Sequence, residues 1–249
     1  MRTPWCLPAG FLLLFFGVAH GQATKSTIIS VGFLDSREAN GNLVAVGYTP
    51  QPGDIILFDA HNRLHHAFYK MANTSAPTHS AIVIAKPGGG TALLDIVGPF
   101  PPLAKVEVVN VETRLPNYKG SIMVRRIKQP LTPEQNQRLT DFAYAQNGKR
   151  FALGRIILQV TPFCPRNGLR HTLFARTELD RSRWFCSELV IAACTVGGVL
   201  DSATCPANAT YPRDLAYDER FDFSPYFYPP TPWANEAIVV KDEKRVAVE

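Results

Sequence analysis

The sequence has little that would hold a protein in a membrane or on a nucleic acid. After the first 21 residues it contains no apolar run as long as the roughly 20 residues that a membrane-spanning helix needs. The formal net charge is only +5. Two short basic clusters, Arg125-Arg126 and the mixed-sign stretch Lys241 to Arg245, are too small for a nucleic-acid footprint, and we interpret both as solvated surface. We therefore expect neither a nucleic-acid partner nor an integral membrane span.

The residue spacings of common metal sites are also missing. No pair of cysteines stands at the separation typical of a zinc site. His65 and His66 are adjacent, and neighbours on a helix point about 100° apart, so the pair does not share a face. We expect no metal ion and no other cofactor.

The first 21 residues are typical of a secretory signal. Arg2 supplies a positive charge, and Phe11 to Val18 is an apolar core too short to span a bilayer as a helix. Small residues at Ala19 and Gly21 predict cleavage after Gly21. We expect the protein to be secreted or periplasmic. An uncleaved N-terminal anchor is the alternative.

The chain has five cysteines, of which Cys6 would leave with the signal. Cys164 and Cys205 lie in loop-like stretches beside prolines, and they are the pair that we expect to form a disulfide. Cys194 falls inside the helical pattern that follows Cys186 and is interpreted as a small buried residue. The sequence leaves the connectivity open.

Strand patterns come first in the chain and most helix patterns follow. Strands are expected at Ile55–Phe58, His79–Ala85, Thr91–Val97, Val106–Val111 and Gly120–Ile127. Helices are expected over His61–Asn73, from Pro133 with Thr132 as N-cap, and from Cys186 to Gly197. This order favours an α+β fold.

The chain is expected to fold as one domain over residues 51–240. Residues 22–50 are weakly patterned and are interpreted as an N-terminal extension, and residues 241–249 as a frayed tail. Residues 161–183 form a long polar loop, which suggests a role in shaping a site. The Pro- and aromatic-rich residues 211–233 are expected to be irregular chain packed on the domain.

Two segments more than a hundred residues apart carry the chemistry. Cys186 stands at the start of an apolar helix, where backbone N–H groups and the helix dipole favour a thiolate. His79 opens an apolar strand and can take the proton of a thiol. Each residue also has a structural interpretation, as a core cysteine and as a histidine that hydrogen-bonds at a strand end. Together they predict a Cys–His nucleophilic site.

Asp95 is the candidate for a third member of this site. It is an acid inside an apolar strand, and it follows the turn Gly88-Gly89-Gly90 after the His79 strand. A hairpin centred on that turn brings Asp95 back beside His79, where an imidazole can compensate a buried charge. The alternative is an acid on the solvent face of the strand.

Three motifs in this order resemble the circularly permuted papain-like amidases of the YiiX/YaeF type, within the wider NlpC-type superfamily. They are Pro52-Gly53-Asp54-Ile55-Ile56-Leu57, Thr78-His79-Ser80-Ala81-Ile82-Val83 and Phe185-Cys186-Ser187-Glu188-Leu189-Val190. Tyr211 to Leu215 is similar to a further family stretch, so the resemblance runs from about Gln51 to Leu215. In the permuted branch the histidine strand precedes the cysteine helix, as it does here.

The resemblance implies an antiparallel sheet or half-barrel packed on helices, with the nucleophile at a helix N-terminus. It implies Cys186 as the nucleophile, His79 as the general base and Asp95 as the polar third member. The protein is then expected to be an exported cysteine hydrolase that acts through an acyl-enzyme on a small-molecule, peptide or lipid substrate with an acyl group. The alternatives are an acyltransferase of the same fold and a non-catalytic ligand-binding module. The second oxyanion donor is not evident.

Overall fold

The computed structural model describes residues 28–32, 44–61, 63–99, 103–155, 161, 171, 173 and 175–233. The predicted signal segment, Cys164 and the predicted tail at 241–249 lie outside these residues. The expectations about the signal segment and the tail therefore stay predictions.

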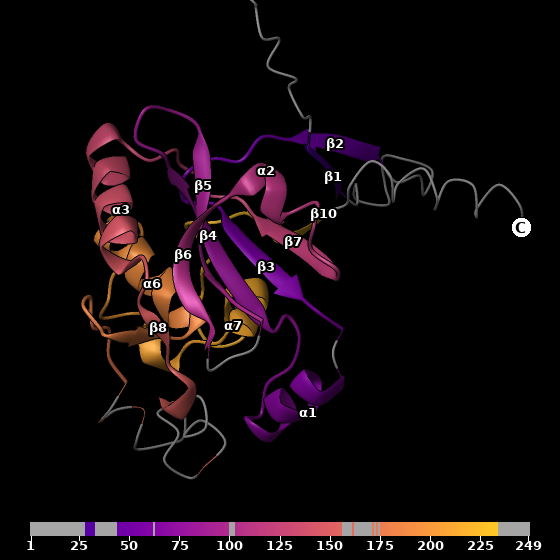
Figure 1. Ribbon diagram of the computed structural model, residues 1–249, viewed down its shortest axis with the longest axis vertical. Helices are drawn as coiled ribbons and strands as arrows, with labels where there is room; N and C mark the ends of the chain where they lie inside the picture. The colour runs from indigo at the N-terminus through magenta and orange to yellow at the C-terminus, as the bar shows by residue number, and fades with distance from the viewer. Residues whose placement is uncertain are drawn as a thin grey trace, which may run out of the picture.

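The described residues form a mixed α+β structure around one sheet of ten strands (Figure 1). The spatial order of the strands is β2-β1-β10-β7-β3-β4-β5-β6-β8-β9. Pairing is antiparallel except between β8 and β9. The strands are β1 Ile28–Gly32, β2 Val44–Tyr48, β3 Ile55–Asp59, β4 His79–Ala85, β5 Thr91–Val97, β6 Lys105–Asn110, β7 Ser121–Arg125, β8 Arg150–Phe151, β9 Arg183–Trp184 and β10 Thr231–Trp233.

The helices lie on both faces of this sheet, with α3 and α6 on one side and the short α2 on the other (Figure 1). The helical elements are α1 Arg63–Met71, α2 Val111–Arg114, α3 Pro133–Gln146, α6 Cys186–Val196, the 3₁₀ turn η2 Ala207–Ala209 and α7 Pro212–Tyr217. The expected N-cap of α3 is confirmed: Thr132 accepts a hydrogen bond from the Gln135 N–H, and the Gln135 side chain accepts one from the Thr132 N–H.

Strand β3 shows why the sheet is buried on both faces. Its five residues are all buried, and alternate side chains point to opposite faces. Ile55 and Leu57 pack into the core beneath α3 and α6, whereas Ile56 and Phe58 pack into a second core on the α2 side. A strand buried on both faces is apolar along most of its length, and β3 is apolar at every position except its last, Asp59.

Two segments, residues 22–50 and 211–233, contain more regular structure than the sequence indicated. Residues 22–50, expected to be an extension, carry β1 and β2, which form a hairpin within the sheet. Residues 211–233, expected to be irregular, carry α7 and β10. Strand β10 lies between β1 and β7, so both predictions missed the strands that complete this side of the sheet. A strand as short as Thr231–Trp233, which includes Pro232, shows no period-2 pattern to detect.

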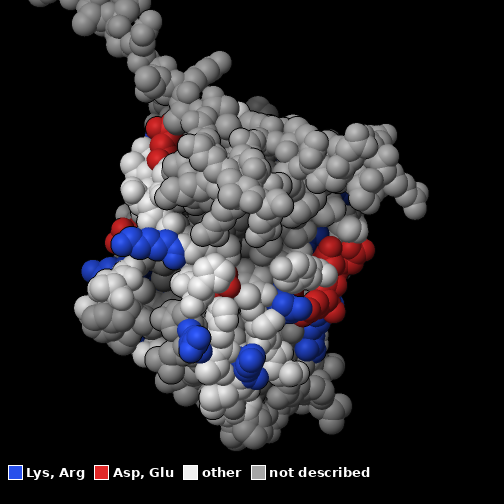
Figure 2. Space-filling model, turned by 90° about the vertical axis from the view of Figure 1, so that its right-hand side faces the viewer, with Lys and Arg blue, Asp and Glu red and all other residues white. Residues whose placement is uncertain are grey.

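On the face shown in Figure 2, most Lys and Arg side chains are separated by uncharged residues, and acidic side chains gather along one edge beside several of them. Within the described part of the chain, no helix has both the length and the apolar character to cross a bilayer.

Candidate active site

Cys186 is the first residue of α6. Phe185, directly before it, has the extended backbone of an N-cap residue but offers no side-chain hydrogen bond to the helix. The first backbone N–H groups of a helix have no partner within the helix, so they are available to an anion at this end. The Cys186 side chain is almost buried, with 4% of the residue exposed. A thiolate here lies in the field of the helix dipole.

His79 and Asp95 meet at the start of β4. His79 Nε2 lies 2.5 Å from Asp95 Oδ1. The Asp95 carboxylate is completely buried, and the His79 side chain keeps 22% of its surface exposed. Because Nε2 is engaged by the carboxylate, Nδ1 is the ring nitrogen left for another partner.

The thiol of Cys186 lies beside this ring and beside Ser80, close enough that both groups act on its pKa. The structure thus brings together the three residues singled out in the sequence, from β4, β5 and α6. Ser80, whose hydroxyl is buried and has no hydrogen-bond partner among the described residues, was not predicted as part of the site. Its position directly after His79 was the only sequence signal.

The charges of these groups stabilise one another. Burial alone would raise the pKa of the Cys186 thiol, but the positive His79 ring and the polar groups of Ser80 beside the sulfur outweigh it and lower this pKa. Burial would lower the pKa of His79, but the Asp95 carboxylate and the Cys186 thiolate raise it to about 10. The arrangement therefore favours a thiolate beside an imidazolium over a neutral pair.

Arg114, at the end of α2, is a further member that the sequence analysis missed. Its Nε donates a hydrogen bond of 2.8 Å to Asp95 Oδ2. Burial would raise the pKa of Asp95, but His79 and Arg114 outweigh it and hold this pKa below its usual value. No sequence signal placed Arg114 here, because α2 is a four-residue helix without an amphipathic pattern.

Tyr69 of α1 borders the same site. Its hydroxyl donates a hydrogen bond of 2.5 Å to the carbonyl oxygen of Thr78, the residue before His79. Burial and the nearby charge of Cys186 raise the pKa of Tyr69 well above its ordinary value, so the side chain is a neutral phenol at neutral pH. The bond ties α1 to the start of β4.

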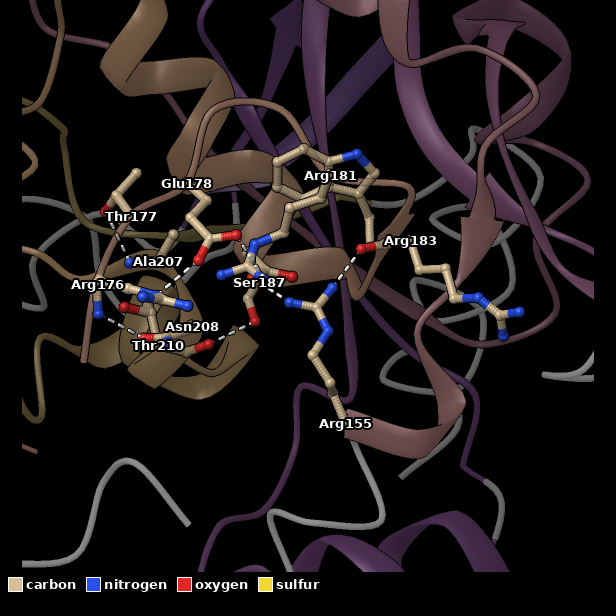
Figure 3. Close-up of polar contacts among 12 residues, drawn as sticks. Arg155, Arg176, Thr177, Glu178, Arg181, Arg183, Ser187, Ala207, Asn208 and Thr210 are labelled. Carbon is tan, nitrogen blue, oxygen red and sulfur yellow. Dashed lines mark hydrogen bonds and ion pairs between the residues drawn. The ribbon is translucent and has the colours of Figure 1, made fainter. Parts of the chain in front are cut away.

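Behind the cysteine, Glu188 pairs with two arginines, Arg155 and Arg181, whose side chains lie near Ser187 in Figure 3. Its Oε1 lies 2.6 Å from Arg155 Nη1 and 2.8 Å from Arg181 Nε, and the residue is fully buried. Arg155 also donates a hydrogen bond to the carbonyl oxygen of Arg183 in β9. On the same helix, the Ser187 hydroxyl donates a 2.6 Å hydrogen bond to the Thr210 carbonyl oxygen. The first turn of α6 is thereby fixed to three separate segments.

The other described cysteines are buried free thiols, which corrects the expected bridge between Cys164 and Cys205. The Cys205 sulfur instead lies 3.5 Å from the Thr210 hydroxyl oxygen, inside the core under α6. Burial raises the pKa of Cys205 to about 12 and moves that of Cys194 higher still. Neither thiol is placed or activated as Cys186 is.

The histidines near α1 lie against an acid. His66 Nε2 is 2.7 Å from Asp59 Oδ1, and His61 Nδ1 is 3.6 Å from Asp59 Oδ2. Among the residues that the structure describes, no three His, Cys, Asp or Glu side chains are arranged to hold a metal ion.

No protein-family model and no curated protein sequence matches this chain. Among solved structures it is similar to the metalloprotein YiiX from Escherichia coli O157:H7, with 21% sequence identity and a TM-score of 0.41. The similarity covers 59% of this chain and 66% of YiiX, just under two thirds of its length. A likeness of this extent is a partial similarity of structure and carries nothing about activity.

Proposed function

We propose that this protein is a cysteine hydrolase that cleaves an amide or ester through a thioester acyl-enzyme. The observation that carries the proposal is the chain of contacts from Asp95 to His79 to Cys186, with the thiol at the N-terminus of α6. A nucleophile beside a base, with a third group that hydrogen-bonds to the base and orients it, is the arrangement that nucleophilic catalysis needs.

The proposed reaction starts from the thiolate of Cys186 and the imidazolium of His79. The thiolate attacks the carbonyl carbon, and the electron pair of the C=O bond moves to oxygen. When the tetrahedral intermediate collapses, the bond to the leaving amine or alcohol breaks and His79 Nδ1–H gives that group its proton. Neutral His79 then takes a proton from water, which attacks the thioester, releases the acid and restores the thiolate.

The developing oxyanion needs hydrogen-bond donors. The backbone N–H of Cys186 is one candidate, because Phe185 leaves the first turn of α6 without a side-chain cap. Asp95 orients the His79 ring through Nε2 and stabilises its positive charge.

The proposed fold is the permuted papain-like arrangement, with the His79 strand before the Cys186 helix and the domain spanning residues 51–240. We also propose that the chain is exported, with cleavage after Gly21. These proposals rest on the motifs of the sequence. An exported hydrolase of this chemistry would act on a peptide, an N-acyl amino acid or a lipid ester, and an acyltransferase would use the same acyl-enzyme with another acceptor.

One observation favours a second candidate, a non-catalytic ligand-binding module. Cys186 is only 4% exposed, and a substrate carbonyl must reach its sulfur. The two candidates differ in whether the thiol reacts in the folded protein.

The test is turnover of p-nitrophenyl acyl esters of increasing chain length, with intact-mass detection of the acylated protein. Wild type should release nitrophenol and gain the mass of one acyl group, whereas Cys186→Ala should do neither and His79→Ala should acylate far more slowly. Cys194→Ala, which alters a buried thiol of the same helix, is the matched control. Full activity of Cys186→Ala, or no acylation of wild type by any ester together with no alkylation of its Cys186, would reject the hydrolase.

A further inference from the structure

Asp95 has more partners than a simple triad requires. Oδ1 lies 2.5 Å from His79 Nε2 and accepts the Ile96 N–H at 2.7 Å, while Oδ2 accepts Arg114 Nε at 2.8 Å. The carboxylate has no exposed surface. Each of its oxygens is therefore assigned to a different partner, and the carboxylate cannot rotate without giving up a charge-assisted hydrogen bond.

We propose that Arg114 is a positioning residue of the active site, which fixes the Asp95 carboxylate so that it orients and charges His79. This inference rests on the proposed function and adds a fourth member to its Cys–His–Asp arrangement. Cys186, His79, Asp95 and Arg114 then form a row of alternating charges, negative, positive, negative and positive, whose sum is zero.

The scaffold around Arg114 is built to hold its side chain in one place. Its guanidinium carbon lies 5.0 Å from the centre of the Phe58 ring and 5.3 Å from that of Tyr118. Phe58 also packs against the His79 ring at 5.5 Å between centroids. Helix α2 begins with the buried Val111 and is followed by the fully buried Leu115. The guanidinium is thus stacked as well as hydrogen-bonded, an arrangement in which lysine is a poor substitute for arginine.

The remaining charged or titratable groups near Asp95 do not provide a substitute for Arg114. Glu107 of β6 stands opposite Asp95 in the sheet, and it is exposed and of the same sign. Asp59, at the end of β3, is also an acid. Tyr118 is a neutral phenol at neutral pH, because burial and the nearby acids raise its pKa to about 12 although Arg114 opposes them. Loss of Arg114 would leave His79 as the one cation in contact with this buried carboxylate among the described residues.

The test is the pH dependence of Cys186 alkylation by iodoacetamide, read on the Cys186 peptide by mass spectrometry, so that no substrate is needed. Without Arg114, the Asp95 carboxylate takes up a proton at a higher pH than in wild type. Because protonated Asp95 is no longer a counter-ion for His79, the Cys186 thiol should also ionise at a higher pH. We expect the midpoint of the acidic limb in Arg114→Met to rise by about one pH unit, which means roughly tenfold less thiolate below it. Arg114→Lys, which keeps the charge but not the stacked guanidinium, should give a smaller rise.

Two controls separate positioning from general stability. Arg138→Met removes an arginine that donates to carbonyl oxygens at the other end of α6, and should leave the midpoint unchanged. In an Asp95→Asn background, Arg114→Met should cause no further rise, because Arg114 acts through Asp95. The midpoint, unlike the melting temperature, does not move when an arginine is only structural.

The proposal is overturned if Arg114→Met keeps the wild-type midpoint, or shifts it equally with and without Asp95. If Arg114→Met does not fold, Arg114→Lys becomes the test variant. An alkylation midpoint equal to that of wild type in Arg114→Lys would then overturn the proposal. His79→Ala distinguishes this failure from failure of the proposed function. Alkylation that depends on His79 but not on Arg114 rejects only the positioning role, whereas alkylation indifferent to His79 rejects the hydrolase as well.

Discussion

Asp95 reaches His79 diagonally across the β4–β5 hairpin. The strand pairing runs from Ala85 opposite Thr91 to Ile82 opposite Leu94, and its continuation sets Ala81 opposite Asp95. His79, two residues before Ala81, is on the same face of β4, so Asp95 Oδ1 comes within 2.5 Å of the ring. A shift of one residue in register would turn the acid to the other face of the sheet.

Asp95→Asn should weaken the site without disrupting the fold. The amide keeps the shape of the carboxylate but removes the charge that raises the pKa of His79. The imidazolium is then less stable and less thiolate forms, so we expect Cys186 to be alkylated at least about tenfold more slowly at neutral pH. Asp141→Asn, which changes an exposed acid of α3, is the control. Equal rates for Asp95→Asn and wild type would contradict the orientation of His79 by Asp95.

Amide hydrolysis should occur over a wide pH range, and a different group should limit it at each end of that range. Thiolate is lost as pH falls through the lowered pKa of Cys186, so the acidic limb of alkylation should lie below the usual thiol value of about 8.5. The proton needed by a leaving amine is lost as pH rises through the His79 pKa of about 10. Amide hydrolysis should therefore decline near pH 10, whereas alkylation should not. An alkylation midpoint equal to that of the unfolded chain would contradict this prediction.

The free energy of unfolding should depend on Arg155 and Arg181, the two arginines that pair with the buried Glu188. Arg155→Met combined with Arg181→Met leaves a carboxylate uncompensated in the core, and we expect a loss of about 3–5 kcal/mol in the free energy of unfolding. Adding Glu188→Gln should recover most of the loss, because it removes the unpaired charge. Urea denaturation of the three proteins measures both effects.

Arg176 offers the matched control for that experiment. Its side chain is 70% exposed and pairs with Glu178 at the surface, so Arg176→Met should change the free energy of unfolding by less than about 0.5 kcal/mol. A double variant of Arg155 and Arg181 as stable as wild type would show that Glu188 finds another partner.

Thiol reactivity should separate Cys186 from Cys194 and Cys205. The latter two are buried, and burial raises the pKa of each thiol. In the folded, reduced protein we expect iodoacetamide to modify Cys186 first, and the other two only after unfolding in guanidinium. Peptide mapping before and after denaturation reads all three sites. Equal modification of Cys194 in the folded protein would contradict the packing of α6.

The sequence predicted most of the central sheet because its strands are apolar and bounded by clear turns. Strands β4 and β5 flank Pro87-Gly88-Gly89-Gly90, where all three glycines adopt positive φ angles, and such a turn identifies a hairpin from sequence alone. The start of α6 was likewise visible, because polar residues follow Cys186 immediately and an apolar run follows them. The hairpin predicted that Asp95 lies beside His79, whereas the association of Cys186 with this pair rested on Cys–His chemistry and on the family resemblance.

Arg114 and Ser80 were not predictable in the same way. Arg114 contacts Asp95 across 19 positions of chain and through a four-residue helix, and nothing in the local pattern directs its side chain inward. Ser80 points toward the thiol only because β4 alternates its faces beneath α6. The predicted disulfide was wrong for a related reason: the burial of Cys205 comes from packing between α6 and η2, which the flanking prolines do not indicate.

The position of strand β10 in the sheet determines when the β1–β2 hairpin can join the fold. Strand β10 pairs with β7 on one side and, through Trp233 opposite Ser30, with β1 on the other. The hairpin β1–β2 is synthesised first, yet its place in the sheet does not exist until residues 231–233 have left the ribosome. Folding therefore has to bring together two segments about 200 residues apart, a slow step because long loops must close before the contact forms. The candidate catalytic residues do not depend on this step. Strands β3, β4 and β5 pair with one another, and α6 packs on them, without any contribution from β10.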